Sequence, residues 1–158
     1  CSSDLAHGIE STEASYMPMA WTNVRNLAEE GPSRIGGHLF MDKEALLRLD
    51  PEVIFIDGGG LDLVAEDFRR NPKFYGALKA FQTRRAYVLL PFNSYTTNID
   101  TALADAYAIG KILYPDRFRD IDPEAKADEI YSFMVGRPVY REMVKASGPI
   151  GATPAFLK

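Results

Sequence analysis

Two short, continuously apolar segments constrain the fold of this sequence more than any other feature: Val53–Ile56 and Ala86–Leu90. Unbroken apolar runs of this length are typical of strands that are buried on both faces, as in a parallel sheet. Between them, residues 61–81 have apolar side chains at helical spacing, interrupted at Asn71-Pro72. A strand, a helical crossover and a second strand form a βαβ unit. The sequence therefore predicts a layered α/β fold around a small, mostly parallel sheet.

Helical spacing and residues typical of helix ends predict five further helices. These cover residues 19–27, 43–49, 99–113, 123–134 and 138–146. Asp42, Asn98 and Asp122 precede three of them, and such side chains commonly accept a hydrogen bond from a free amide at the start of a helix. Gly136 is expected to end the helix that begins at Pro123.

The length of 158 residues is that of one domain. We expect residues 1–158 to form a single lobe, with a loop over residues 1–17 and an irregular tail over residues 147–158. Two strands make a poor sheet, since independent stability usually requires three or more. Either a third strand lies within Ile35–Phe40, or part of the sheet precedes Cys1.

A cysteine at position 1 fits either the lipid-bearing end of a bacterial lipoprotein or a cut from a longer chain.

Charge and composition exclude several classes of protein. The formal net charge of −4 argues against binding of nucleic acid through non-specific phosphate attraction. The single cysteine excludes an internal disulfide and a cysteine-built metal cage. No apolar run approaches the roughly 20 residues needed to cross a bilayer.

Residues 69–85 hold six basic side chains and no acidic one. A solvated surface is the favoured interpretation of that segment, and an anion or nucleic-acid patch is the alternative.

Two loops follow the predicted strands, and ligands of open parallel sheets bind at the carboxyl ends of the strands. The first loop, Asp57–Gly60, is a poor match to a dinucleotide-binding fingerprint, so a tight packing turn is favoured. The second, Phe92–Asn98, offers amides and hydroxyls at the N-terminus of a predicted helix, which suits an anionic or oxygen-rich ligand. A loop that only satisfies its own backbone is an equally weighted alternative.

Signatures of catalysis and of metal binding are weak. His7, Glu10 and His38 are of types that bind zinc or iron, but they are scattered, and a polar loop is the favoured interpretation. The sequence contains no Gly-x-Ser-x-Gly elbow and no His-Glu-x-x-His motif. An enzyme is therefore disfavoured, and no intrinsic cofactor is expected.

Four segments in order resemble substrate-binding proteins of ABC importers for iron complexes and vitamin B12. Met41–Gly60 (MDKEALLRLDPEVIFIDGGG) is similar to a helix with an early glutamate that leads into a buried strand. Arg84–Pro115 and Asp122–Tyr140 resemble the later parts of the same lobe, and Ala6–Thr12 (AHGIEST) resembles a motif of an iron-complex subgroup. The resemblance covers residues 6–146.

The resemblance implies a bilobal protein with a ligand in the cleft between two α/β lobes that are joined by a long helix. This chain corresponds to the C-terminal lobe, a three-layer α/β/α, Rossmann-like half, and Cys1 then marks a cut in a longer chain. The implied location is the periplasm or the extracytoplasmic face of a bacterial or archaeal membrane. Contact with the membrane is expected only through the transporter or through a lipid anchor on the full-length protein.

The resemblance also implies a ligand and a partner. The ligand is expected to be an iron(III) complex, haem or corrinoid, bound without catalysis. Glu44 matches the glutamate that docks onto arginines of the membrane permease in relatives. The expected ligand-binding residues are His7, Glu10, Ser11, Thr12, Trp21, Asn93, Ser94, Tyr95 and Thr96. Two alternatives remain. One is a small α/β domain that binds a nucleotide or phosphate through Gly58–Gly60 and the basic segment over residues 69–85. The other is a protein that binds a metal ion directly through His7, Glu10 and His38.

Overall fold

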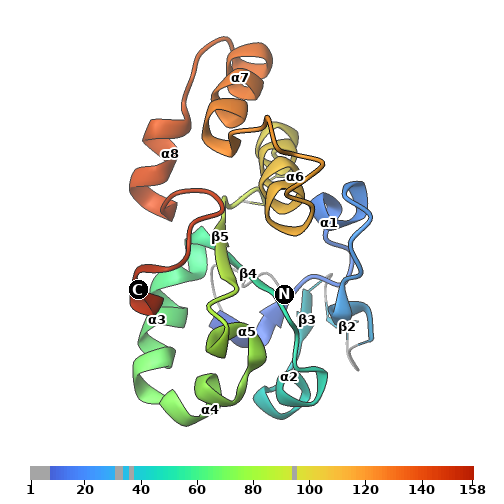
Figure 1. Ribbon diagram of the computed structural model, residues 1–158, viewed down its shortest axis with the longest axis vertical. Coiled ribbons are helices and arrows are strands. Elements are labelled where there is room, and N and C mark those ends of the chain that lie inside the picture. The colour runs from blue at the N-terminus through green and yellow to red at the C-terminus, as the bar shows by residue number, and fades with distance from the viewer. Residues whose placement is uncertain (1–7, 31–33, 36–37, 94–95) are drawn as a thin grey trace.

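The computed structural model describes residues 8–30, 34–35, 38–93 and 96–158, and it confirms the α/β fold (Figure 1). The strands are β1 (Ser11–Thr12), β2 (Arg34–Ile35), β3 (His38–Phe40), β4 (Ile54–Asp57) and β5 (Ala86–Leu89). The α-helices are α1 (Met17–Trp21), α2 (Lys43–Leu49), α3 (Leu61–Arg70), α4 (Pro72–Ala77), α5 (Lys79–Gln82), α6 (Ile99–Leu113), α7 (Pro123–Val135) and α8 (Tyr140–Ser147). Short 3₁₀ turns are η1 (Gly8–Glu10), η2 (Leu27–Glu30), η3 (Gly58–Gly60) and η4 (Ala155–Leu157). None of the helices in this described part of the chain combines the length and apolarity of a membrane span.

The two predicted buried strands form the parallel sheet. Strand β4 pairs with β5 in register from Ile54 opposite Ala86 to Asp57 opposite Leu89. The other edge of β5 is covered by the C-terminal tail, because the Val88 amide donates to the Ala152 carbonyl at 2.9 Å and the Val88 carbonyl accepts from Gly151 at 2.7 Å. The tail, although irregular, thus pairs with the outer edge of β5 at Val88.

The strand that we expected within Ile35–Phe40 exists in part, but it does not extend the parallel sheet. Strand β3 lies between β1 and β2 in a separate antiparallel sheet. The expectation that this segment supplies the missing strand of the parallel sheet is therefore wrong for the described residues. The physical reason is that β3 already pairs along both of its edges, with Ser11 opposite Phe40 and Arg34 opposite Leu39.

Helices cover both faces of the parallel sheet, and the alternation of side chains along β4 explains why. Ile54 and Ile56 point into a core built with α2, α3, α4 and α5. Phe55 points into a second core built with α1, α6, α7 and α8. Helices α7 and α8 lie at one end of the molecule, and α2 and α4 lie at the other (Figure 1). The sheet is thus the middle of three layers.

Two of the three predicted helix caps are confirmed and one is wrong. The Asp42 carboxylate accepts from the Ala45 amide at 2.7 Å, and the Asp122 carboxylate accepts from the Glu124 amide at 3.0 Å. Asn98 occupies the N-cap position of α6, but its side chain makes no capping hydrogen bond. The Asp100 carboxylate instead accepts from the Thr101 amide at 2.7 Å. An acidic residue in the first turn can take over the role of the cap.

The helix predicted over residues 19–27 is wrong in extent. Helix α1 ends at Trp21, where the Thr22 hydroxyl donates to the Pro18 and Met19 carbonyls at 3.0 Å each. Asn23 then adopts a φ of 54°, in the left-handed region that ends a helix. The apolar spacing continues past this point because Val24 packs against the core of α1 and α6, and Leu27, which begins the separate 3₁₀ turn η2, lines a pocket with Met19 and Phe55.

Candidate functional site

The carboxyl ends of β4 and β5 lie side by side, and two of the predicted ligand-facing segments meet near them. Strand β4 leads into η3, and β5 leads through Leu90 into the loop that ends at Asn98. The Asn93 side-chain amide donates to the Glu13 carboxylate at 2.8 Å, which joins this loop to the segment over residues 8–16. The Tyr16 and Phe92 rings pack edge-on at 5.3 Å between centroids. Segments 80 residues apart in the sequence thus form one surface.

The loop after β5 retains both of its interpretations. The Asn98 backbone amide donates to the Phe92 backbone carbonyl at 2.8 Å, and the Thr97 hydroxyl donates to the side-chain amide oxygen Oδ1 of Asn93 at 3.2 Å. These two bonds satisfy polar groups of the described part of the loop within the loop itself. Asn93 and Thr96 are nevertheless exposed and accessible to a ligand. Of the other predicted ligand residues, His7, Ser94 and Tyr95 lie outside the described residues.

Ser11 and Thr12 are fully buried in β1 rather than presented on a surface. Their hydroxyls have no hydrogen-bond partner among the described residues. Burying a hydroxyl without a partner costs about 1–3 kcal/mol. In this arrangement neither hydroxyl is accessible to a ligand.

Glu10 and Trp21 lie apart from the Asn93 loop. Glu10 lines a polar pocket of about 380 Å³ with Glu66, Asp67 and Arg70 of α3. Trp21, which is 47% exposed, lines a different groove of about 380 Å³ with Leu103, Tyr107 and Phe118. Of the predicted ligand residues that the structure describes, those that are not buried thus lie on three surfaces.

Metal binding through His7, Glu10 and His38 stays a prediction. His7 lies outside the described residues, and His38 belongs to β3. Within the ranges that the structure describes, no group of three or more His, Cys, Asp or Glu side chains is arranged to hold a metal ion.

Asp105, a fully buried carboxyl on α6, was not among the residues predicted from the sequence. It accepts a hydrogen bond from the Leu90 amide at 2.9 Å and a long one from the Tyr16 hydroxyl at 3.5 Å. Burial raises the pKa of Asp105 well above its usual range; the Leu90 hydrogen bond partly opposes this shift, and the negative Asp57 adds to it. The sequence does imply that Asp105 is buried, because it lies in the apolar stripe of the predicted helix over residues 99–113, three residues after Ala102 and four before Ile109.

Replacing Asp105 with asparagine is expected to make the free energy of unfolding less dependent on pH. Folding raises the pKa of Asp105, so the native state holds the carboxyl proton more tightly than the unfolded state does. The contribution of Asp105 to the free energy of unfolding is therefore fully present at low pH and decreases as the pH rises above about 4, the ordinary pKa of an aspartate. Asparagine still accepts from Leu90 but carries no charge. Urea unfolding at pH 4.5 and 7.5 should therefore show the variant gaining stability relative to the wild type at the higher pH. An unchanged difference at the two pH values would contradict the assignment.

The triglycine turn is explained by packing, as the sequence analysis favoured. A Cβ atom on Gly58 would lie 2.4 Å from the Cβ and 2.5 Å from the carbonyl oxygen of Ser147, at the end of α8. The Gly59 amide, which a phosphate-binding loop would direct at its ligand, donates to the Asp57 carboxylate at 2.7 Å. This geometry disfavours the alternative of a nucleotide-binding turn.

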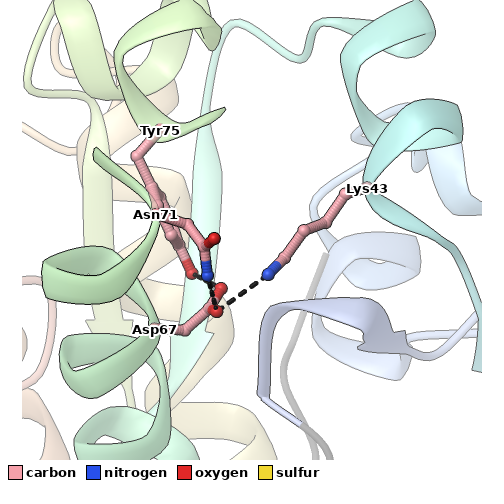
Figure 2. A network of polar contacts seen from close by, with 4 residues as sticks. All are labelled: Lys43, Asp67, Asn71 and Tyr75. Carbon is pink, nitrogen blue, oxygen red and sulfur yellow. Dashed lines mark hydrogen bonds and ion pairs between the residues drawn. The ribbon is translucent and has the colours of Figure 1, made fainter. Parts of the chain in front are cut away.

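Glu44 is exposed in the first turn of α2, and the neighbouring Lys43 fastens this helix to the rest of the lobe. Figure 2 shows that the Asp67 carboxylate of α3 accepts from Lys43, Asn71 and Tyr75, at 2.8, 2.6 and 2.8 Å. Partial burial acts to raise the pKa of Asp67, but these hydrogen bonds lower it overall. Lys43 also lies 5.4 Å from the centre of the Phe74 ring. The network holds α2 against α3 and α4 while Glu44 faces solvent.

Comparison with known proteins supports the fold. No family model matches the chain, and no curated protein matches it. The crystal structure of a periplasmic solute binding protein from Veillonella parvula is similar over 85% of this chain, with a TM-score of 0.60 and 18% sequence identity. This chain covers 41% of the length of that protein. At this level of identity, the likeness establishes that both share an α/β fold.

Proposed function

We propose that this chain is one lobe of an extracytoplasmic solute-binding protein that delivers its ligand to an ABC importer. The observation that carries the proposal is the structural likeness to a periplasmic solute binding protein, of which this chain spans 41%. A lobe-sized match to a longer binding protein agrees with the resemblance of the sequence to C-terminal lobes of that class. In this proposal the ligand lies between this lobe and a second one.

The geometry at the carboxyl ends of β4 and β5 supports a binding role. The segments over residues 8–16 and 91–98 meet there and are joined by the Asn93–Glu13 hydrogen bond. The exposed residues among those described in these segments are Ser15, Asn93, Thr96 and Thr97, which offer hydroxyl and amide groups, and the carboxylate of the half-buried Glu13 lies beside them. We propose that the ligand is an iron(III) chelate, haem or corrinoid, whose peripheral oxygen and amide groups match such a surface.

The proposed contact with the permease is through Glu44. An exposed carboxylate in the first turn of a helix offers two oxygens to an arginine guanidinium. The Lys43–Asp67 contact limits the motion of the helix that carries it. Helix α2 is thus held against α3 while it presents Glu44 to solvent.

The decisive experiment compares ligand binding by this chain with binding by the longer protein that contains it. The probes are a ferric catecholate chelate, a ferric hydroxamate chelate, haemin and cyanocobalamin. Calorimetry is expected to show that the longer protein binds one probe at least about a hundredfold more tightly, since a lone lobe loses contacts worth roughly 3 kcal/mol or more. Equal affinities for the two proteins would contradict a site shared between lobes.

Two controls separate this proposal from its alternatives. A thermal-shift screen with nucleotides tests the phosphate-binding alternative, and stabilisation by a nucleotide but by no metal chelate would replace our proposal. Elemental analysis of the purified protein tests direct binding of a metal ion. Stoichiometric metal without a chelate would favour that alternative.

A further inference from the structure

A buried carboxyl lies beneath the point where the two ligand-facing segments meet. Asp105, fully buried on α6, accepts from the amide of Leu90, the residue that connects β5 to the loop over residues 91–98. Its second carboxylate oxygen lies 3.5 Å from the hydroxyl of Tyr16, where the segment over residues 8–16 ends. One side chain thus contacts the base of both segments.

Further contacts connect this carboxyl to the surface. Tyr16 and Phe92 are both almost fully buried and pack edge-on. Directly beyond Phe92, Asn93 donates to Glu13. The Glu13 carbonyl in turn accepts from the side chain of Asn26 at 2.7 Å. The path from Asp105 to the exposed Asn93 consists of adjoining side chains.

We propose that Asp105 is a positioning residue, which with Tyr16 fixes the described parts of the two ligand-facing segments, around Glu13 and Asn93, in one arrangement before the ligand arrives. A binding surface that is already ordered loses less conformational entropy when the ligand binds. A buried polar group that is fully hydrogen-bonded also specifies one arrangement, whereas an apolar side chain permits several. The proposal depends on the proposed function only for its effect on ligand affinity.

The surroundings of Asp105 show what holds it in place. Asp57 at the end of β4 and Tyr131 of α7 interact with it electrostatically, in addition to Tyr16. The negative charge of Asp57 disfavours a negative charge on Asp105, whereas the hydrogen bond from the Leu90 amide stabilises a charge on Asp105. The carboxyl oxygen that accepts from the Leu90 amide, rather than the negative charge of Asp105, is therefore what the proposed positioning role requires. Asparagine at this position is expected to preserve the arrangement and alanine to lose it.

The first experiment measures hydrogen exchange of two backbone amides in this chain. The Leu90 amide reports the bond to Asp105, and the Asn98 amide, which donates to Phe92, reports the loop. We expect Asp105→Ala to accelerate exchange at both by at least about tenfold, and Asp105→Asn by less than about threefold. If Asp105→Ala does not fold, Tyr16→Phe is used, with a few-fold acceleration expected at Asn98.

The matched control is Tyr131→Phe. Tyr131 is also buried, in the same core as Tyr16 and Phe92, and its hydroxyl also bonds to a side chain of α6, Thr101 at 3.1 Å. Among the described residues, however, its hydroxyl makes no hydrogen bond to either ligand-facing segment. Exchange at Leu90 and Asn98 should therefore not change in this variant. Equal acceleration by Tyr131→Phe and by the Asp105 or Tyr16 variant would show general loosening and overturn the proposal, as would unchanged exchange in Asp105→Ala.

The second experiment measures affinity for the four probes in the longer protein. Asp105→Ala is expected to weaken binding at least about tenfold, while Asp105→Asn and Tyr131→Phe bind as the wild type does. Equal binding by Asp105→Ala and the wild type would overturn the role in ligand binding. If no probe binds to the wild type, the proposed function fails, and the exchange experiment still decides whether Asp105 positions the loop.

Discussion

Replacing Glu44 with arginine is expected to reduce uptake through a reconstituted importer at least about tenfold and to leave ligand affinity unchanged. Glu44 is exposed in the first turn of α2, whereas the two segments that meet at the strand ends lie on other elements. Charge reversal would bring a guanidinium against the arginines that we propose on the permease. Like charges brought together in an interface cost several kcal/mol, which is more than a tenfold loss requires. The measurements are transport into proteoliposomes and calorimetry with the same probe.

The matched control is Glu142→Arg. Glu142 is likewise exposed in the first turn of a helix, α8, so that its reversal changes the net charge and the helix terminus in the same way. Uptake by this variant should equal that of the wild type. Unchanged uptake in Glu44→Arg, or an equal loss in both variants, would refute docking through α2.

The βαβ core was predictable because its signals are local. Apolar residues fill both faces of β4 and β5, and Asn71-Pro72 separates α3 from α4. Continuous apolar runs of this kind are typical of parallel strands that are buried on both faces. The Asp42 and Asp122 caps were predictable for the same reason, since each acts within three residues of its own position.

The pairing of β3 was not predictable, because it depends on partners far along the chain or across a turn. Any short apolar run near the sheet is compatible with either sheet, and only the three-dimensional arrangement decides. The end of α1 depends on the conformation of one residue, Asn23, which apolar spacing does not reveal. Apolar spacing indicates which side chains are buried. Because buried side chains also occur outside helices, this spacing does not show where a helix ends.

The candidate site was predictable as a place but not as a set of residues. The rule that ligands bind at the carboxyl ends of parallel strands placed the candidate site at the loop after β5. It did not separate Asn93, which faces the segment over residues 8–16, from Trp21, which lies in a groove beside α6. Asp105 was missed because helical spacing alone assigns buried positions to apolar residues, and a buried carboxyl departs from that rule.

Replacing Gly58 with alanine is expected to destabilise the fold by about 2–3 kcal/mol, because the new Cβ has no room. It would lie 2.5 Å from a backbone oxygen of Ser147, which cannot move without displacing the end of α8. Ser147 is almost fully buried and is held by its hydrogen bond to the Met143 carbonyl at 2.9 Å. Urea unfolding should show a lower midpoint with an unchanged slope.

Gly76→Ala is the control that separates lost space from lost backbone freedom. Gly76 is exposed in α4, and a Cβ there would meet no atom within 4 Å. Alanine should therefore stabilise the fold by about 0.5–1 kcal/mol, since it restricts the unfolded chain without straining the native one. Opposite signs for the two substitutions are the expected result. If Gly58→Ala is neutral or stabilising, then the end of α8 does not pack on the triglycine turn, and that turn becomes available to a ligand.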